Sequence, residues 1–277
     1  MRLLFEECVV IERPTFGVIL MVRRRKGWKT NALFLIALWL ILLIASLTVL
    51  SSAVTPFLKS LQTQSLISLD WSGYAVSSNL LAQQPIVTGV NGSWTVPRVA
   101  YSATDVFSAA WVGVGGQSDT TLIQVGTEHD FVNGQEQYSV WYEMLPANSI
   151  TIPEVTVVPG DKISASISLV DSNMNNWQIE ITNLSNGQGF KQIFSYNSSR
   201  LTAEWVVERP TVNNQLAALA NFGTVTFTNA TAQISATEGT VKSFSNYEIL
   251  MNDRQNNQLV TVSSLSPDGS SFTVAYG

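Results

Sequence analysis

The sequence predicts an all-β domain that forms an antiparallel sandwich, preceded by an apolar N-terminal helix. Runs of alternating polar and apolar residues recur from about Leu69 to the end of the 277-residue chain. Such alternation is typical of half-buried strands. Turn signals separate the runs, and no helical pattern alternates with them, as in a sandwich. One apolar segment of 19 residues near the N-terminus stands apart.

This apolar segment, Ala32–Leu50, follows the basic stretch Arg23–Lys29. A basic flank followed by about 20 apolar residues can span a bilayer with its basic side inside the cell. Ser51–Ala53 then has the small-x-small form of a signal-peptidase site. The chain beyond Ala53 is therefore expected to be exported.

We divide the N-terminal part into a basic leader, residues 1–30, and a signal peptide or transmembrane anchor, residues 31–53. Cleavage of this segment and its retention as an anchor both stay open. The apolar run is longer than is usual in a signal peptide, and its length suits a transmembrane anchor. Translation from Met21 instead of Met1 would give a basic region of ordinary length. The following domain is expected to be extracellular, secreted or anchored, and to meet a membrane only through this segment.

The exported part begins with residues 54–67, which are predicted to be a linker or weak helix, and continues as one domain over residues 68–277. The clearest strand patterns are Lys162–Val170, Trp177–Asn183 and Gly223–Asn229. Turn signals occur at Pro159–Asp161, Asn186–Gly187 and Pro267–Gly269, and the last predicts a hairpin at the C-terminus. Only Asn213–Phe222 suggests a helical turn or two.

Charge and cysteine content exclude several kinds of site. The first 53 residues hold seven of the 15 basic and three of the 20 acidic residues, so the domain is acidic and nucleic acid is an improbable partner. Cys8 is the only cysteine and lies in the leader, which leaves the domain without a thiol nucleophile or thiolate metal site. The single histidine, His129, cannot form a two-histidine zinc motif and has no Gly-x-Ser-x-Gly partner. Flanked by Glu128 and Asp130, it is expected at the surface.

Polar groups inside strand patterns are the remaining candidates. In Thr121–Gly126, Leu122 and Gln124 share one strand face. An unpaired buried amide costs about 1–3 kcal/mol, so Gln124 needs a partner or a function.

Carboxylates raise the same question, because an ionised carboxylate is costly to bury. Glu204 and Glu208 share one face of Ala203–Glu208, and Glu143 lies within Ser139–Met144. A sheet with one wet concave face would accommodate all three.

Eight short segments, taken in order, resemble the sequence motifs of a known protein family. They are DWSGY (Asp70–Tyr74), GSWTVP (Gly92–Pro97), AAWVGVGG (Ala109–Gly116), TLIQVGTE (Thr121–Glu128), VWYEMLP (Val140–Pro146), VVPGDKI (Val157–Ile163), AEWVVERP (Ala203–Pro210) and LANFGTVTFTNA (Leu219–Ala230). Each is weak alone, but together they resemble the glutamic peptidases, or eqolisins, and especially prokaryotic members. The resemblance covers about Leu69 to Gly277.

The resemblance implies a lectin-like sandwich of two large antiparallel sheets, one with a concave face that forms the substrate cleft. It places the catalytic glutamine at Gln124 and the catalytic glutamate at Glu208. The amide would bind an oxyanion and orient a water, and the carboxylate would move that water's proton. The reference pKa of Glu is about 4.3, so an acid optimum is expected. No metal or cofactor is needed, the substrates are proteins or peptides, and a monomer is expected.

The resemblance also implies that Trp71, Trp111, Trp141 and Glu143 bind substrate or support the cleft. The loop Met144–Thr151 occupies the place of a family loop that borders it.

The chain departs from the family at two positions in or near these segments. Gly115 stands where members often carry an acid, and Ser139 stands where the fungal enzymes carry an aspartate. The class of chemistry is unaffected, but the neighbours that tune pKa and substrate preference differ.

Three alternatives stay open on this scaffold. A carbohydrate-binding module could use the same aromatic, amide and acid residues. A glycosidase could use two of Glu143, Glu204 and Glu208. An inactive peptidase homologue could serve in adhesion.

Overall fold

The computed structural model describes residues 8–9, 22–23 and 63–277. The predicted anchor and most of the predicted linker lie outside these residues. The short strands β1 (Cys8–Val9) and β2 (Val22–Arg23) pair with each other in antiparallel fashion. Within the described ranges, no helix is both long and apolar enough to cross a membrane.

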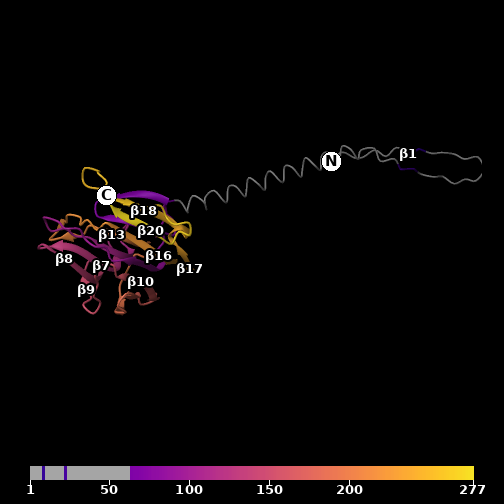
Figure 1. Cartoon of the computed structure of the whole chain (residues 1–277). Helices are drawn as coiled ribbons and strands as arrows, with labels where there is room; N and C mark the ends of the chain where they lie inside the picture. Colours follow the sequence, from indigo (N-terminus) through magenta and orange to yellow (C-terminus); the bar gives the residue numbers. More distant parts are fainter. Residues whose placement is uncertain (1–7, 10–21, 24–62) are drawn as a thin grey trace, which may run out of the picture. The chain divides into compact units, whose positions relative to one another are not determined.

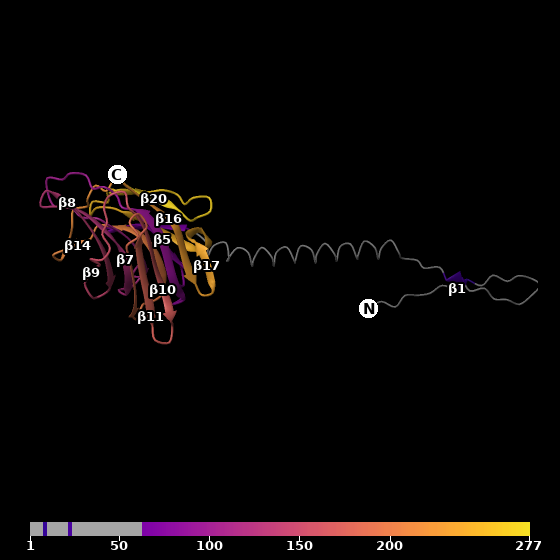
Figure 2. The same ribbon diagram turned by 60° about the horizontal axis from the view of Figure 1, so that its bottom comes forward.

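Residues 63–277 form two eight-stranded sheets that pack on each other, as Figures 1 and 2 show. The first sheet has the order β3 (Thr63–Ser68), β18 (Ser245–Met251), β4 (Trp71–Ser77), β13 (Thr202–Glu208), β6 (Ala109–Gly115), β7 (Leu122–Val132), β8 (Gln135–Met144) and β9 (Ile150–Thr151). Its pairs are antiparallel except β3 with β18. The predicted all-β sandwich is confirmed.

The second sheet has the order β12 (Gly189–Ser195), β11 (Asn176–Asn183), β10 (Lys162–Asp171), β5 (Val87–Thr95), β16 (Thr224–Ile234), β20 (Phe272–Tyr276) and β19 (Val260–Val262), with β17 (Thr237–Thr240) beside β16. A short 3-10 helix, η1 (Val241–Ser243), follows β17. The strands predicted over 162–170, 177–183 and 223–229 all lie in this sheet. The predicted C-terminal hairpin is β19 with β20, and the Asn186–Gly187 turn joins the paired strands β11 and β12.

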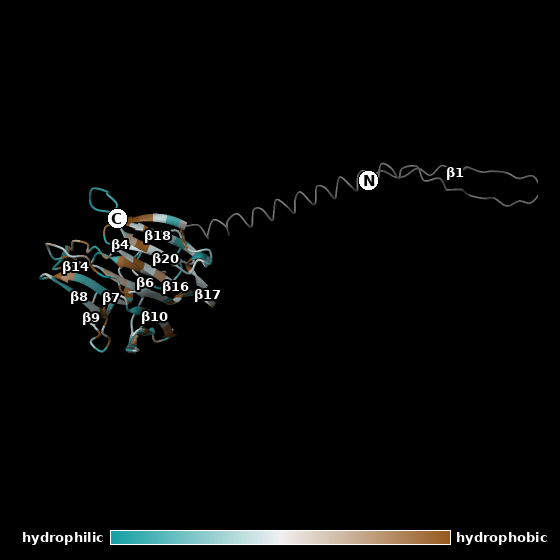
Figure 3. Cartoon of the chain, in the orientation of Figure 1, coloured by the Kyte–Doolittle hydropathy of each residue, from teal (hydrophilic) through white to brown (hydrophobic). Residues whose placement is uncertain are grey.

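Strand alternation separates the core from the outer face of the first sheet. On β7, Ile123 and Val125 enter the core between the sheets, whereas Leu122 belongs to a second apolar cluster on the other face. On β13, Trp205 points into the core and donates from Nε1 to the Asn91 carbonyl at 2.7 Å. Figure 3 shows brown, white and teal stretches along the strands, as on β18, and teal on connecting loops. The outer face can therefore carry polar residues without disturbing the core.

The structure corrects the predicted linker at its end. Thr63–Ser68 forms strand β3, which runs parallel to β18. The Ser65 hydroxyl also donates to the Glu248 carboxylate at 3.0 Å. The sequence missed this strand because it gains its hydrogen bonds from residues about 180 positions away, and no local pattern records that pairing.

The helical turns predicted over 213–222 are also wrong. Its first residues belong to a hairpin formed by β14 (Thr211–Val212) and β15 (Gln215–Leu216). Asn213 and Asn214 between them have φ values of 50° and 60°. Two consecutive residues with positive φ form the tight two-residue turn that favours asparagine, so turn chemistry decides this segment rather than helix propensity.

Gly126 provides a test of how closely the first sheet is packed. It lies on β7 between Trp111 of β6 and Trp141 of β8. A Cβ at this position would lie 2.4 Å from the Ala110 carbonyl oxygen and 2.5 Å from Trp111 Cβ. We expect Gly126→Ala to lower the free energy of unfolding by about 1–3 kcal/mol, because backbone must move to admit the methyl group.

Thermal or denaturant unfolding measures this effect. Gly189→Ala is the matched control, because the nearest atom to its new methyl group would be the Thr182 hydroxyl oxygen at 3.2 Å, and the nearest backbone atom would be the Ile181 carbonyl oxygen at 3.5 Å. Equal stability of the two variants would contradict the prediction.

Candidate active site

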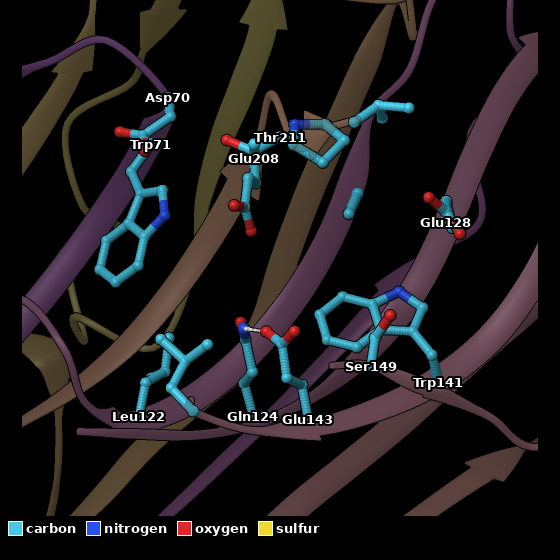
Figure 4. A pocket seen from close by; sticks show the side chains of 14 residues that line it. Asp70, Trp71, Leu122, Gln124, Glu128, Trp141, Glu143, Ser149, Glu208 and Thr211 are labelled. Atoms are coloured by element: carbon cyan, nitrogen blue, oxygen red, sulfur yellow. Dashed lines mark hydrogen bonds between the residues drawn. The ribbon is translucent and has the colours of Figure 1, made fainter. Parts of the chain in front are cut away.

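A pocket of about 360 Å³ opens on the outer face of the first sheet. Four carboxyl groups line it, together with one amide and two tryptophans (Figure 4). The lining residues are Asp70, Trp71, Ala109, Leu122, Gln124, Glu128, Trp141, Glu143, Leu145, Ser149, Glu208, Pro210, Thr211 and Val212. None of these described residues is basic, so the pocket is acidic.

Gln124 and Glu208 lie on the two strands that flank β6. Gln124 on β7 lies opposite Gly113 of β6. Glu208 on β13 lies opposite Ala109 of the same strand. Trp111 lies between these two positions on the same face of β6, and a Cβ at Gly113 would lie 2.8 Å from its ring. Glycine at 113 therefore leaves room for the Trp111 ring, and Gln124 and Glu208 point toward each other in Figure 4.

The Gln124 amide is buried and held on one side only. Its side chain is 3% exposed, and Nε2 donates to Glu143 Oε2 at 2.6 Å. Its carbonyl oxygen Oε1 has no hydrogen-bond partner within the described structure. Burial raises the pKa of Glu143, and the Gln124 hydrogen bond opposes that rise. The amide therefore presents a free acceptor and one further N–H.

Glu208 is held by a tryptophan from the neighbouring strand. Trp111 Nε1 donates to Glu208 Oε2 at 2.7 Å. The Trp111 ring packs edge-on against Trp71, with ring centres 4.9 Å apart and planes at 79°. Burial raises the pKa of Glu208 above its ordinary value, and the Trp111 N–H opposes the rise by stabilising the carboxylate. Glu208 is only half-buried and borders the open pocket, so water there hydrates the charged form and also opposes the rise.

Trp111→Phe tests this hydrogen bond. Phenylalanine keeps an aromatic ring but has no N–H, so the Glu208 carboxylate loses a charge-assisted hydrogen bond worth about 1.5–3 kcal/mol. The pKa of Glu208 should rise by about 1–2 units. Any activity that needs ionised Glu208 should then begin at a correspondingly higher pH, measured as the acid limb of the kcat/KM profile. An unmoved acid limb would contradict the prediction.

The predicted site residues separate into two groups. Gln124, Glu208, Trp71, Trp141 and Glu143 line the pocket and come from four strands of the first sheet, β7, β13, β4 and β8. Trp111 is fully buried and does not line the pocket; it contacts the site through its hydrogen bond to Glu208 and its packing against Trp71.

Further pocket residues were not singled out from the sequence. Asp70 immediately precedes β4, and Glu128 lies four residues after Gln124 on the same face of β7. The period-two pattern could have identified Glu128. Ser149 lies in the loop before β9, where no periodic pattern points to it.

Glu128 and Asp130 form a close acid pair beside the pocket. Burial raises the pKa of Asp130 to about 8, and the charge of Glu128 adds to the rise. Burial also raises the pKa of Glu128. The Ser108 backbone N–H donates to Asp130 Oδ1 at 3.2 Å, which partly offsets the burial of that carboxyl. The pair therefore favours carrying at least one proton.

The predicted surface position of His129 is wrong. The side chain is fully buried, and burial lowers its pKa to about 3. Its Nε2 lies 2.7 Å from the Thr127 hydroxyl, which also accepts from Trp94 Nε1 at 2.9 Å. Neighbours in a strand face opposite sides, so the flanking acids lie on the outer face while His129 points inward.

Over the described part of the chain, no group of three or more histidine, cysteine, aspartate or glutamate residues could hold a metal ion.

The fold and the site together define a β-sandwich hydrolase whose acidic cleft pairs an amide with a carboxyl group. The chain belongs to the Peptidase A4 family, whose profile matches residues 70–276. This confirms the resemblance to the glutamic peptidases.

Two relatives and one further solved structure support the assignment. Aspergillopepsin-2 of Aspergillus niger is 30% identical over 213 residues, which cover 68% of this chain and 73% of that protein. Aspergilloglutamic peptidase from Aspergillus niger is 29% identical, with a TM-score of 0.55 over 62% of this chain and 99% of its own. Scytalido-glutamic peptidase with a transition state analog inhibitor is similar in fold, with 22% identity and a TM-score of 0.64 over 76% of this chain and 99% of its own. The chain is a glutamic-type acid endopeptidase, and its substrates are peptides.

Proposed function

We propose that Gln124 and Glu208 are the catalytic pair of this endopeptidase and that they activate a water between them. One observation carries the proposal. The buried Gln124 amide has no hydrogen bond to its carbonyl oxygen within the described structure, and it faces Glu208 in the pocket that both residues line. Each member is positioned by a hydrogen bond: Gln124 donates one to Glu143, and Glu208 accepts one from Trp111.

The two groups would divide the chemistry. The Glu208 carboxylate takes a proton from the water, whose oxygen attacks the peptide carbonyl carbon. The Gln124 carbonyl orients that water, and the N–H that is not bonded to Glu143 donates to the oxyanion of the tetrahedral intermediate. Glu208 then gives its proton to the leaving nitrogen, and the carbon–nitrogen bond breaks.

Trp71 and Trp141 would contact the substrate from opposite sides of the pocket, where Figure 4 places them. Their rings offer large apolar surfaces beside an otherwise acidic site, which suits substrate side chains with aliphatic or aromatic parts.

The peptidase domain would comprise residues 68–277, with β3 adding an edge strand to it. We infer that it works outside the cell, either secreted or anchored by residues 31–53, and that only this N-terminal segment meets a membrane. It is expected to act as a monomer.

The proposal is tested by incubating the purified chain with an unfolded protein between about pH 2 and 7, a range that brackets the reference pKa of Glu. Cleavage confined to acid that resists a metal chelator and an aspartic-peptidase inhibitor supports it. A folded chain that cleaves nothing at any pH but retains sugars would support a carbohydrate-binding module instead. A glycosidase pair that includes Glu204 is disfavoured, because that side chain is fully buried and does not line the pocket.

A further inference from the structure

A short hydrogen bond joins Gln124 to Glu143. These residues lie directly opposite each other on β7 and β8. The distance from Nε2 to Oε2 is 2.6 Å, short for an N–H donor, as hydrogen bonds to carboxylates are. Among the residues that the structure describes, Glu143 is the one hydrogen-bond partner of the Gln124 side chain.

The partner matters because an amide can face either way. The NH₂ and carbonyl ends of glutamine are similar in size, and a half-turn exchanges donor and acceptor. The proposed chemistry needs the carbonyl toward the water and an N–H toward the oxyanion. The Glu143 carboxyl oxygen accepts this hydrogen bond, so the NH₂ end of Gln124 faces Glu143 and its carbonyl end faces away.

Glu143 also contacts the loop that borders the pocket. The Ser149 backbone N–H hydrogen-bonds to the Glu143 carboxyl group. At the other end of the loop, the Leu145 N–H donates to the Leu122 carbonyl at 2.9 Å. Tyr196 supports the same end, because its hydroxyl donates to the Leu145 carbonyl at 2.9 Å and accepts from the Leu122 N–H at 2.8 Å. The pocket residues Leu145 and Ser149 are thus both tied to β7 or β8.

We propose that Glu143 is a positioning residue: its carboxyl group fixes the orientation of the catalytic Gln124 amide and links it to the loop at Ser149. The proposal rests on the proposed function of Gln124 and Glu208. It replaces the substrate-binding role that the sequence suggested for Glu143, because the carboxyl group is already engaged by two protein donors.

Glu143→Gln is the most informative variant. The glutamine amide has a single acceptor oxygen. It cannot impose one orientation on Gln124 and also accept the hydrogen bond from the Ser149 backbone N–H. We expect kcat to fall about 10- to 100-fold, the scale of a misplaced catalytic group, with KM within about threefold of wild type because no substrate contact is lost. The negative charge of Glu143 raises the pKa of Glu208, so its removal should also shift the acid limb of the activity profile to lower pH.

Two further variants separate orientation from charge and from folding. Glu143→Asp keeps the charge, but its side chain is one methylene shorter and its carboxyl oxygens lie farther from Gln124. This variant should have a lower kcat, while the acid limb of its activity profile moves less than in Glu143→Gln. Glu154→Gln, an exposed change of the same charge, should leave kcat and the acid limb unchanged. Thermal unfolding at the assay pH identifies any variant whose loss comes from misfolding.

The outcomes are distinct. A higher KM with unchanged kcat in Glu143→Gln would overturn the proposal in favour of substrate binding, and wild-type kinetics in both variants would also overturn it. Glu208→Gln assayed in parallel checks the underlying mechanism. If that variant still cleaves, the proposed pair is wrong, whereas an inactive Glu208→Gln beside a fully active Glu143→Gln refutes only the positioning role.

Discussion

Glu208→Gln is expected to abolish peptide-bond cleavage while the domain stays folded. Glutamine has nearly the same shape as glutamate and can still accept the 2.7 Å hydrogen bond from Trp111 Nε1. It cannot take a proton from water, and removal of a general base costs about 100- to 10,000-fold in rate. Because Glu208 also returns the proton to the leaving nitrogen, we expect the upper part of this range.

Gln124→Ala should lower kcat by a similar factor for a different reason. The variant removes the group proposed to orient the water and bind the oxyanion, and loss of one oxyanion donor costs about 100- to 1,000-fold in kcat. It also leaves the Glu143 carboxyl without its 2.6 Å donor.

These variants should be compared as kcat at several acidic pH values, with Glu154→Gln as the exposed control. Unfolding curves must show that each variant is folded. Turnover by Glu208→Gln within tenfold of wild type would exclude Glu208 as the general base.

Glu204→Gln is expected to stabilise the protein at neutral pH without effect in acid. Glu204 is fully buried on β13, between Gly113 and Ala75 of the adjacent strands. Neither carboxyl oxygen has a hydrogen bond of good geometry within the described structure. Burial raises its pKa well above the ordinary value, and the charge of Asp119 adds to the rise. The folded state therefore favours the protonated form.

The sign of the pH dependence follows from proton binding. A raised pKa means that the folded protein holds this proton more tightly than the unfolded chain, whose Glu has a pKa of about 4.3. The stability associated with this proton is present below that value. It declines above it by about 1.4 kcal/mol per pH unit until the raised pKa of the folded state is passed. Glutamine stays neutral at every pH, so this decline should disappear in Glu204→Gln.

The measurement is Tm as a function of pH for wild type and variant. The two curves should coincide near pH 3 and diverge as pH rises, with the variant more stable at pH 7. Glu238→Gln, at an exposed position, should follow wild type. Parallel curves for Glu204→Gln and wild type would contradict the prediction.

Several carboxyl groups together define an acidic working range. Raised pKa values at Glu204, Glu128 and Asp130 make the fold less stable as pH rises. The proposed activity needs ionised Glu208, so activity falls as the pH drops and Glu208 becomes protonated. The enzyme should therefore lose activity in strong acid by titration of its base, and toward neutral pH by loss of structure.

The sequence by itself determined much of this domain because strand signals are local. Side-chain alternation and turn residues predicted the sandwich, strands such as 162–170 and 177–183, and the C-terminal hairpin. The same alternation showed that Gln124 shares a strand face with Leu122, and that Glu204 shares one with Glu208. The eight segments identified the family, because their order is a property of the chain alone.

The tertiary structure decided which strands became neighbours. Trp111 meets Glu208, and Gln124 meets Glu143, only because β13, β6, β7 and β8 lie side by side. It also placed His129 in the core and gave residues 63–68 a partner strand. Side-chain alternation shows which residues share one face of a strand. It does not show which face other elements of the fold bury, or which elements these are. Those properties arise from pairings between distant segments, which a local pattern does not contain.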